Sequence, residues 1–144
     1  MQQIEKLDIN FKLAILNKLP ERFAYWKLLG LKLVDVERGW AKMLLPFSEK
    51  ITNALGISHG GALFSLADSA GSIAAVSMAS KGEITTTIEM KINYIKPFSK
   101  GNAIAEARII HFGKSLVLAD VDVKNEEGIL IAKGTGNFLR KIRN

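Results

Sequence analysis

A helix-length apolar segment with a single acid inside it constrains the fold of this chain more than any other feature. Residues 61–79 contain four serines and one charged residue, Asp68. A membrane span is disfavoured, because an Asp at the centre of a span costs about 2.5 to 3.5 kcal/mol on insertion scales. A helix that is apolar on nearly all sides must then be surrounded by protein. The segment therefore predicts a central helix buried inside a folded domain.

Strand-like stretches lie on both sides of this segment. Residues 31–39 and 40–47 meet at Glu37-Arg38-Gly39, which is a hairpin signal. After the helix, breaks at Pro97, at Gly113-Lys114 and at Glu126-Glu127-Gly128 separate four further strands. These strands are predicted over residues 87–95, 103–112, 115–124 and 129–141.

The alternation of side chains within two of these strands predicts which face is buried. One side of the strand at 115–124 carries Val117, Ala119, Val121 and Val123. In the strand at 87–95 one face carries Ile88, Met90, Ile92 and Tyr94, and the other carries Thr87, Glu89, Lys91 and Asn93. We therefore expect Ile88 to point toward the core and Thr87 to point away from it.

The N-terminal residues predict helices outside this sheet. Ile4, Leu7, Phe11, Ile15 and Leu19 follow a helical spacing among charged residues, so residues 1–19 predict an amphipathic helix and not a signal peptide. Pro20 can open a second short helix that Gly30 would end. We assign residues 1–27 to an N-terminal helical segment.

Length and composition define the fold class. With 144 residues and 48% apolar content, the chain is long enough for one domain, residues 1–144. The order of elements predicts an α+β fold in which a curved antiparallel sheet wraps around one long central helix.

Several function classes are disfavoured by composition. The absence of cysteine excludes disulfides and thiolate metal sites, and only two histidines are present, so we expect no metal. The net charge of +6 suits nucleic acid, an acidic membrane surface or a phosphate-bearing ligand, and no nucleic-acid-binding motif accompanies it. We expect a cytoplasmic protein that binds no nucleic acid and does not span a membrane.

A candidate site begins where the central helix begins. Gly60 and Gly61 leave backbone N–H groups at the positive end of the helix dipole accessible to a carbonyl oxygen, so an oxyanion hole is possible there. An ordinary tight helix entry would use the same residues. Asp68, in the apolar helix, is a candidate base or nucleophile, or it bonds to Ser65, to Ser72 or to a neighbouring strand.

The spacing of these two groups constrains how they can act together. Asp68 follows Gly60 by eight residues, which is about 12 Å along a helix axis. One carbonyl held at Gly60 therefore cannot touch Asp68 of the same chain. An antiparallel second copy would bring its Asp68 beside Gly60 across a two-fold axis. If both groups act together, the site spans a homodimer.

The motif over residues 53–68, Asn-x5-His-Gly-Gly-x6-Asp, resembles that of the PaaI-like (phenylacetic-acid-degradation type) acyl-CoA thioesterases of the hotdog fold. The resemblance covers roughly residues 28–138 and includes the Tyr-x-x-Pro at Tyr94 and Pro97. It implies hydrolysis of an acyl-CoA by a dimer or tetramer, with coenzyme A as part of the substrate and no separate cofactor.

The resemblance also implies roles for particular residues. The Gly60 N–H would polarise the thioester carbonyl, with Gly61 beside it, His59 shaping the turn and Asn53 orienting the carbonyl or the leaving group. Asp68 of the facing subunit would be general base or nucleophile, and Thr87 would position the water. The residues expected near the coenzyme A phosphates are Gly113, Lys114 and Ser115.

Two alternatives remain at this stage. Hotdog hydratases carry an Asp followed five residues later by a His, whereas position 73 here is Ile. A non-catalytic module that binds acyl-CoA is the second alternative, and the presence of Asn53, Gly60 and Asp68 argues against it.

Overall fold

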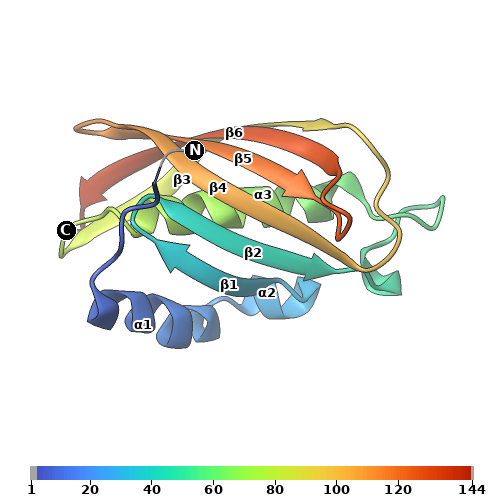
Figure 1. Cartoon of the computed structure of the whole chain (residues 1–144), viewed down its shortest axis with the longest axis horizontal. Coiled ribbons are helices and arrows are strands. Elements are labelled where there is room, and N and C mark those ends of the chain that lie inside the picture. Colours follow the sequence, from blue (N-terminus) through green and yellow to red (C-terminus); the bar gives the residue numbers. More distant parts are fainter. Residues whose placement is uncertain (1–2, 144) are drawn as a thin grey trace.

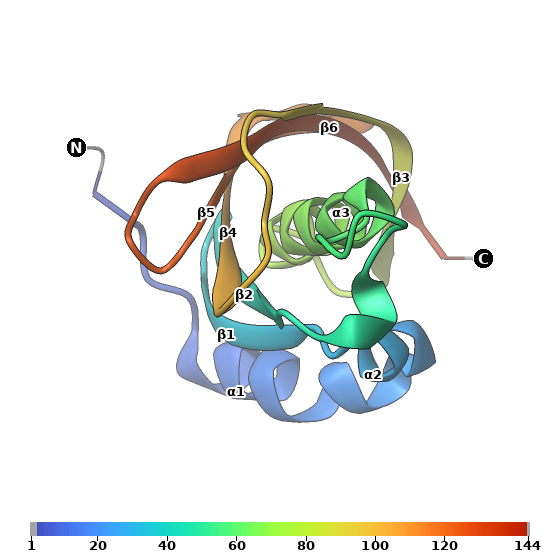
Figure 2. The same ribbon diagram turned by 90° about the vertical axis from the view of Figure 1, so that its right-hand side faces the viewer.

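The fold consists of one curved antiparallel sheet wrapped around one long helix. A computed structural model describes residues 3–143 of the chain. The sheet order is β1-β2-β4-β5-β6-β3, and α3 lies in its concave side (Figures 1 and 2). The bounds are β1 (Lys32–Glu37), β2 (Trp40–Pro46), α3 (Gly60–Val76), β3 (Glu83–Tyr94), β4 (Asn102–Phe112), β5 (Leu116–Lys124) and β6 (Leu130–Ile142). The predicted α+β architecture is confirmed.

Small side chains allow the sheet to approach α3 closely. The inward residues of β4, which are Ala103, Ala105 and Ala107, are fully buried, and so are Val117, Ala119, Val121 and Val123 of β5, as predicted. At Gly71 of α3, an added Cβ would lie 2.8 Å from the Phe138 ring. The helix therefore needs a glycine at this contact with β6. Among residues 3–143, no helix has the length and apolarity needed to cross a bilayer.

The N-terminal segment forms a layer against β1, but its first helix is shorter than predicted. Helix α1 spans Ile9–Lys18, a single 3-10 turn follows at Pro20–Arg22, and α2 spans Ala24–Leu29. Gly30 ends α2 with a φ of 83°, the left-handed conformation expected of a helix-ending glycine. Residues 1 and 2 of the predicted segment lie outside the described residues.

Residues 3–8 are not helical, because their backbone bonds to the β1–β2 hairpin. The Leu7 N–H donates to the Glu37 carboxylate at 2.8 Å, and the Arg38 N–H donates to the Glu5 carbonyl at 3.1 Å. Asp8 then caps α1 by accepting the Phe11 N–H at 3.0 Å. The spacing of Ile4 and Leu7 was compatible with a helix, but these tertiary hydrogen bonds decide the conformation.

A β-bulge in β3 reverses the predicted faces of Thr87 and Ile88. The register with β6 shifts between Thr87, which pairs with Phe138, and Glu89, which pairs with Asn137. Ile88 is the extra residue and is 57% exposed. Thr87 therefore points to the inside of the sheet, and Met90 and Ile92 also remain on that face. The prediction for Ile88 and Thr87 was wrong because strict alternation takes no account of a bulge.

Candidate active site

The loop before α3 fixes the first turn of the helix. His59 is the N-cap, and its Nδ1 accepts the Gly61 N–H at 2.8 Å. The His59 N–H donates to the Ile51 carbonyl at 2.7 Å, which ties the helix start to the preceding segment. The Gly60 N–H has no acceptor among residues 3–143. Of the two predicted glycines, Gly60 is therefore the one whose N–H stays available to a ligand.

Tyr94 packs directly on the first residue of α3. Its hydroxyl donates to the Gly60 carbonyl at 2.7 Å, and a Cβ at position 60 would lie 3.0 Å from its ring. At Gly61 an added Cβ would lie 2.9 Å from the His59 Nδ1. A side chain added at either glycine would therefore have to displace its neighbour, Tyr94 or His59. Burial raises the pKa of the Tyr94 hydroxyl, so it stays a neutral donor.

A groove of about 340 Å³ opens beside Gly60, and Tyr94 forms one of its sides. Ser58, Leu63 and Pro97 are among its other lining residues. The sequence predicted no role for Tyr94, although the Tyr-x-x-Pro motif marked its position. The close contact with Gly60 makes Tyr94 part of the candidate site.

Asn53 belongs to the tight turn that leads into this region. Its side-chain oxygen accepts the Leu55 N–H at 2.9 Å, and its backbone N–H donates to the Ile57 carbonyl at 2.8 Å. Gly56 closes the turn with a φ of 75°. Within residues 3–143 the side-chain amide nitrogen of Asn53 has no acceptor. Asn53 thus holds the turn with its side-chain oxygen, and its side-chain N–H groups bond to none of residues 3–143.

Asp68 is half-buried and bonds to the neighbouring strand. Its carboxylate accepts the Thr87 hydroxyl at 2.8 Å, which the β3 bulge makes possible. Burial raises the pKa of the Asp68 carboxyl, and the Thr87 hydrogen bond partly opposes this shift. Ser65 donates instead to the Gly61 carbonyl at 2.9 Å. Of the alternatives left open, the neighbouring strand supplies the hydrogen bond to Asp68.

Asp68 lies on the side of α3 that residues 3–143 of its own chain cover least. From Gly61 to Val76 the residues that are not buried are Gly61, Phe64, Asp68, Ser72 and Val76. Their spacing of three and four residues places them in a single line along the helix. We call this line the open stripe of α3. It contains Asp68 and begins next to Gly60.

The β4–β5 turn lies at the end of the molecule opposite the start of α3 (Figure 1). It contains Gly113, Lys114 and Ser115, and the last two are exposed. The turn is held by Arg140 of β6. The Arg140 guanidinium donates to the Gly113 carbonyl at 3.1 Å, and the Arg140 backbone N–H donates to the Ser115 carbonyl at 2.8 Å.

The sequence predicted no role for Arg140 at the site. It pairs with Glu83 at 2.6 Å, and its guanidinium lies 4.1 Å from the centre of the Phe112 ring. The only sequence signal was the basic C-terminal cluster that contains it. Arg140 therefore joins the turn to the first residue of β3.

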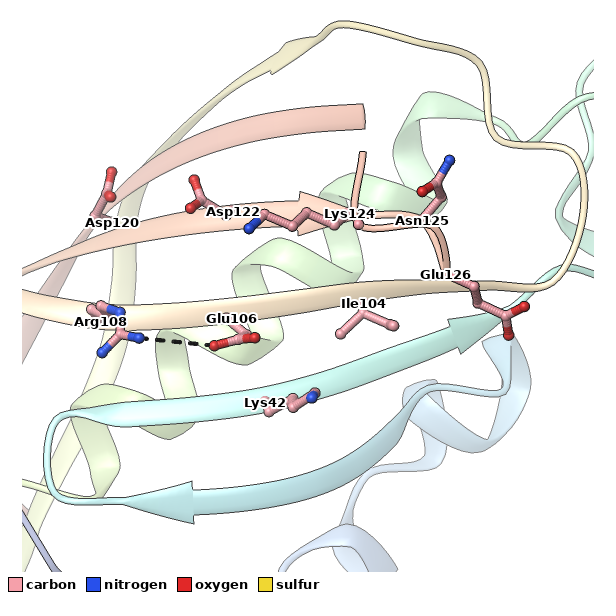
Figure 3. A pocket seen from close by; sticks show the side chains of 10 residues that line it. Lys42, Ile104, Glu106, Arg108, Asp120, Asp122, Lys124, Asn125 and Glu126 are labelled. Atoms are coloured by element: carbon pink, nitrogen blue, oxygen red, sulfur yellow. Dashed lines mark ion pairs between the residues drawn. The ribbon is translucent and has the colours of Figure 1, made fainter. Parts of the chain in front are cut away.

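A second depression lies on the outer face of the sheet and is separate from these residues. Figure 3 shows its charged side chains projecting from β2, β4 and β5. The depression has a volume of about 270 Å³. Glu106 and Arg108 line it, whereas Ala105 and Ala107 on the same strand face α3. Lys133 on this face pairs with both Asp120 and Asp122 at 2.6 Å. The sheet separates this depression from Asp68.

The structure thus places the predicted residues at three locations. His59, Gly60 and Gly61 meet at the start of α3, close to the turn of Asn53. Asp68 and Thr87 meet near the middle of the helix, and the β4–β5 turn stands apart. Among residues 3–143, no three His, Cys, Asp or Glu side chains gather in a way that could hold a metal ion. Within one chain the helix start and Asp68 remain about 12 Å apart along the axis.

Comparison with known proteins identifies the class of this protein. The family model of the thioesterase superfamily matches residues 55–132. A relative from Saccharolobus solfataricus, named as a candidate esterase, is 35% identical and is matched over 85% of this chain and 81% of its own length. The chain therefore belongs to the thioesterase superfamily, a class of thioester hydrolases.

Two further comparisons narrow the class. The 1,4-dihydroxy-2-naphthoyl-CoA hydrolase of Listeria monocytogenes is 33% identical over 68% of this chain and 80% of its own length. The solved structure of the Escherichia coli PaaI protein, from the phenylacetic acid degradation operon, is 27% identical. It aligns with a TM-score of 0.79 over 85% of this chain and 88% of that chain. The chain is thus a PaaI-like thioesterase with the hotdog fold.

Proposed function

We propose that this protein hydrolyses acyl-CoA thioesters at active sites shared between two copies of the chain. The available Gly60 N–H of one copy would bind the thioester carbonyl oxygen, where negative charge develops in the transition state. Asp68 of the second copy would activate a water molecule or attack the carbonyl carbon itself. If Asp68 activates water, the water adds to the carbonyl carbon, the C–S bond breaks, and the proton taken up by Asp68 passes to the coenzyme A thiolate. If Asp68 attacks, the C–S bond breaks as an acyl–Asp68 anhydride forms, and a water molecule then hydrolyses this anhydride and supplies the proton for the thiolate. Either route consumes one water and releases the carboxylic acid and coenzyme A as the thiol.

The observation that carries this proposal is the position of both groups on the uncovered side of α3. The Gly60 N–H has no acceptor in residues 3–143, and the half-buried Asp68 lies on the open stripe. If a second α3 packs antiparallel so that Gly60 meets Asp68, the residue midway between them, Phe64, meets its own copy. A half-buried Phe at the two-fold axis suits such a contact, because it can bury apolar surface against itself.

The edge of the sheet next to this stripe supports the same arrangement. Strand β3 stands last in the sheet order, so within residues 3–143 one edge of its twelve residues has no neighbouring strand. A long unpaired edge is a template for pairing with another chain. Thr87, which bonds to Asp68, lies on β3. A second copy that pairs along β3 would therefore cover the stripe that contains Asp68.

The remaining predicted residues have roles consistent with their contacts. His59 would hold the first turn of α3, Asn53 would direct its amide N–H groups at the carbonyl or the leaving group, and Thr87 would orient Asp68 or the attacking water. The β4–β5 turn, with Gly113, Lys114 and Ser115, would contact the coenzyme A phosphates. The name of the Listeria relative supports a CoA thioester as the substrate class.

An assay of free thiol release from a panel of acyl-CoAs tests this proposal. We expect wild type to release coenzyme A, and we expect Asp68→Asn and Asp68→Ala to lose most of this activity. If wild type cleaves no acyl-CoA, or if Asp68→Ala cleaves as fast, the non-catalytic binding module becomes the better interpretation. Light scattering tests the shared site, because a stable and active monomer would exclude it.

A further inference from the structure

The short helix α2 is bonded to α3 through two serines that flank Asp68 in sequence. The Tyr25 hydroxyl lies 2.7 Å from the Ser65 hydroxyl, and the Trp26 indole N–H donates to the Ser69 hydroxyl at 3.0 Å. Because Ser65 uses its own hydrogen toward the Gly61 carbonyl, Tyr25 is the donor in the first bond. A chain of hydrogen bonds therefore runs from Tyr25 through Ser65 to the first turn of α3.

Helix α2 is held in a defined position by this packing. Six residues are too few for a helix that is stable alone, so contacts with the rest of the fold must fix it. Trp26 is 3% exposed and stacks on Phe23 with 4.0 Å between ring centres. Tyr25, the neighbour of this buried anchor, is 53% exposed. About half of the Tyr25 side chain is thus left exposed by residues 3–143, although its hydroxyl is fixed.

The tethered Tyr25 ring borders the open stripe of α3. Ser65 lies three residues before Asp68 and four after Gly61, or about 4.5 Å and 6 Å along the axis. Around the axis it is rotated by about 60° from Asp68 and by about 40° from Gly61. Thr87 contacts Asp68 from β3, whereas Tyr25 approaches Ser65 from α2. The stripe therefore lies between the edge strand and the Tyr25 ring.

We propose that Tyr25 is a wall of the acyl-binding site and limits the size of the acyl group; this inference rests on the proposed function. An acyl group whose carbonyl is held at Gly60 extends over the stripe beside Gly61 and Phe64. The tether to Ser65 prevents the Tyr25 ring from swinging away, so the ring closes the site toward α2. The site thus favours compact acyl groups over long straight chains. Tyr25 determines specificity and takes no part in the chemical step.

The test compares kcat/KM for a short and a long straight-chain acyl-CoA, such as butyryl-CoA and dodecanoyl-CoA. We define the chain-length ratio as kcat/KM for dodecanoyl-CoA divided by kcat/KM for butyryl-CoA. In Tyr25→Ala we expect this ratio to rise roughly tenfold or more, because even one methylene in a closed pocket changes discrimination between substrates by about that factor. Tyr25→Phe keeps the ring but loses the tether, so a smaller rise is expected. Ser65→Ala should raise the ratio by as much as Tyr25→Phe does. The double variant should raise it little further, because both changes remove the same hydrogen bond.

The control is Lys27→Ala on the same helix. Lys27 points about 200° away from Tyr25 around α2 and pairs with the exposed Glu21 at 3.1 Å, so the ratio should stay at the wild-type value. An unchanged ratio in a folded Tyr25→Ala protein would overturn the inference. If that variant does not fold, Tyr25→Leu gives the same readout with a smaller loss of packing. A wild type that cleaves no acyl-CoA would overturn the proposed function instead.

Discussion

At the scale of single residues, the proposed chemistry depends on Asp68, a carboxylate that burial makes costly to ionise. Burial raises the pKa of Asp68, and the only hydrogen bond to its side chain within residues 3–143 comes from Thr87. A base with a raised pKa accepts a proton more readily near neutral pH than an exposed Asp does. The bulge that turns Thr87 inward therefore bears directly on the reactivity of Asp68.

Replacing Thr87 by Val should move the acidic limb of the pH–rate profile. The Thr87 hydrogen bond stabilises the anion and lowers the pKa of Asp68, so its removal raises that pKa further. We expect the acidic limb of kcat/KM to move to higher pH in Thr87→Val. Thr86→Val, at an exposed neighbouring position, is the matched control and should leave the profile in place. A shift toward lower pH in Thr87→Val would contradict this account.

Asp68→Asn should make the protein more stable at neutral pH while it removes activity. Because burial raises the pKa of Asp68 above its unfolded value, ionisation of this group lowers the free energy of unfolding at neutral pH. This loss of stability disappears as the pH falls through the raised pKa of Asp68 in the folded protein toward its lower pKa in the unfolded chain. Thermal unfolding of both proteins at pH 7 and at pH 4 checks this. We expect Asp68→Asn to unfold a few degrees higher at pH 7 and the difference to shrink at pH 4. A variant that is less stable than wild type at pH 7 would show that the carboxylate stabilises the fold.

At the scale of secondary structure, the sequence predicted most elements but not their local irregularities. The hairpin of β1 and β2, the helix from Gly60 and the inward face of β5 follow from alternation, turn residues and helical spacing. The β3 bulge and the extended residues 3–8 do not, because hydrogen bonds to distant strands determine them. Thr87 entered the predicted site only through resemblance to a family, since alternation alone placed it on the wrong face.

The contact between α3 and β6 gives a prediction at this scale. In Gly71→Ala the new Cβ would lie 2.8 Å from Phe138, which is fully buried and has no room to withdraw. Overpacking of this kind typically costs about 1 to 3 kcal/mol, and we expect a loss of that order in the free energy of unfolding. Urea unfolding of Gly71→Ala and of wild type measures this difference in the free energy of unfolding. Ser72→Ala, one residue further on the partly exposed side, should change stability much less, and equal losses in the two variants would contradict the packing argument.

At the scale of the whole molecule, one chain contains both parts of the proposed site but does not bring them together. The folded chain keeps Asp68 on the open stripe of α3 and Gly60 next to its first residue, about 12 Å apart along the helix axis. The spacing alone predicted this separation. In the proposed function the size of the acyl site would depend on how α2 packs on α3 and on how two copies meet, and neither contact follows from a local sequence pattern.

Two inactive variants that each damage a different half-site test the shared site most directly. Gly60→Pro removes the N–H at the first helical position, where proline is well tolerated, and His59 before it is already extended with a ψ of 137°. A Cβ at position 60 would press on the ring of Tyr94, but this ring is 50% exposed and can shift. Asp68→Asn removes the base.

We expect each of these variants alone to lose roughly 100-fold or more in kcat, the usual effect of losing an oxyanion donor or a general base. The decisive measurement is the activity of a mixed dimer, made by co-expressing the two variants with different tags and purifying on both. A shared site predicts that one of its two sites is intact, so its activity should recover to about half that of wild type. A mixed dimer no more active than its two parents would contradict the shared site.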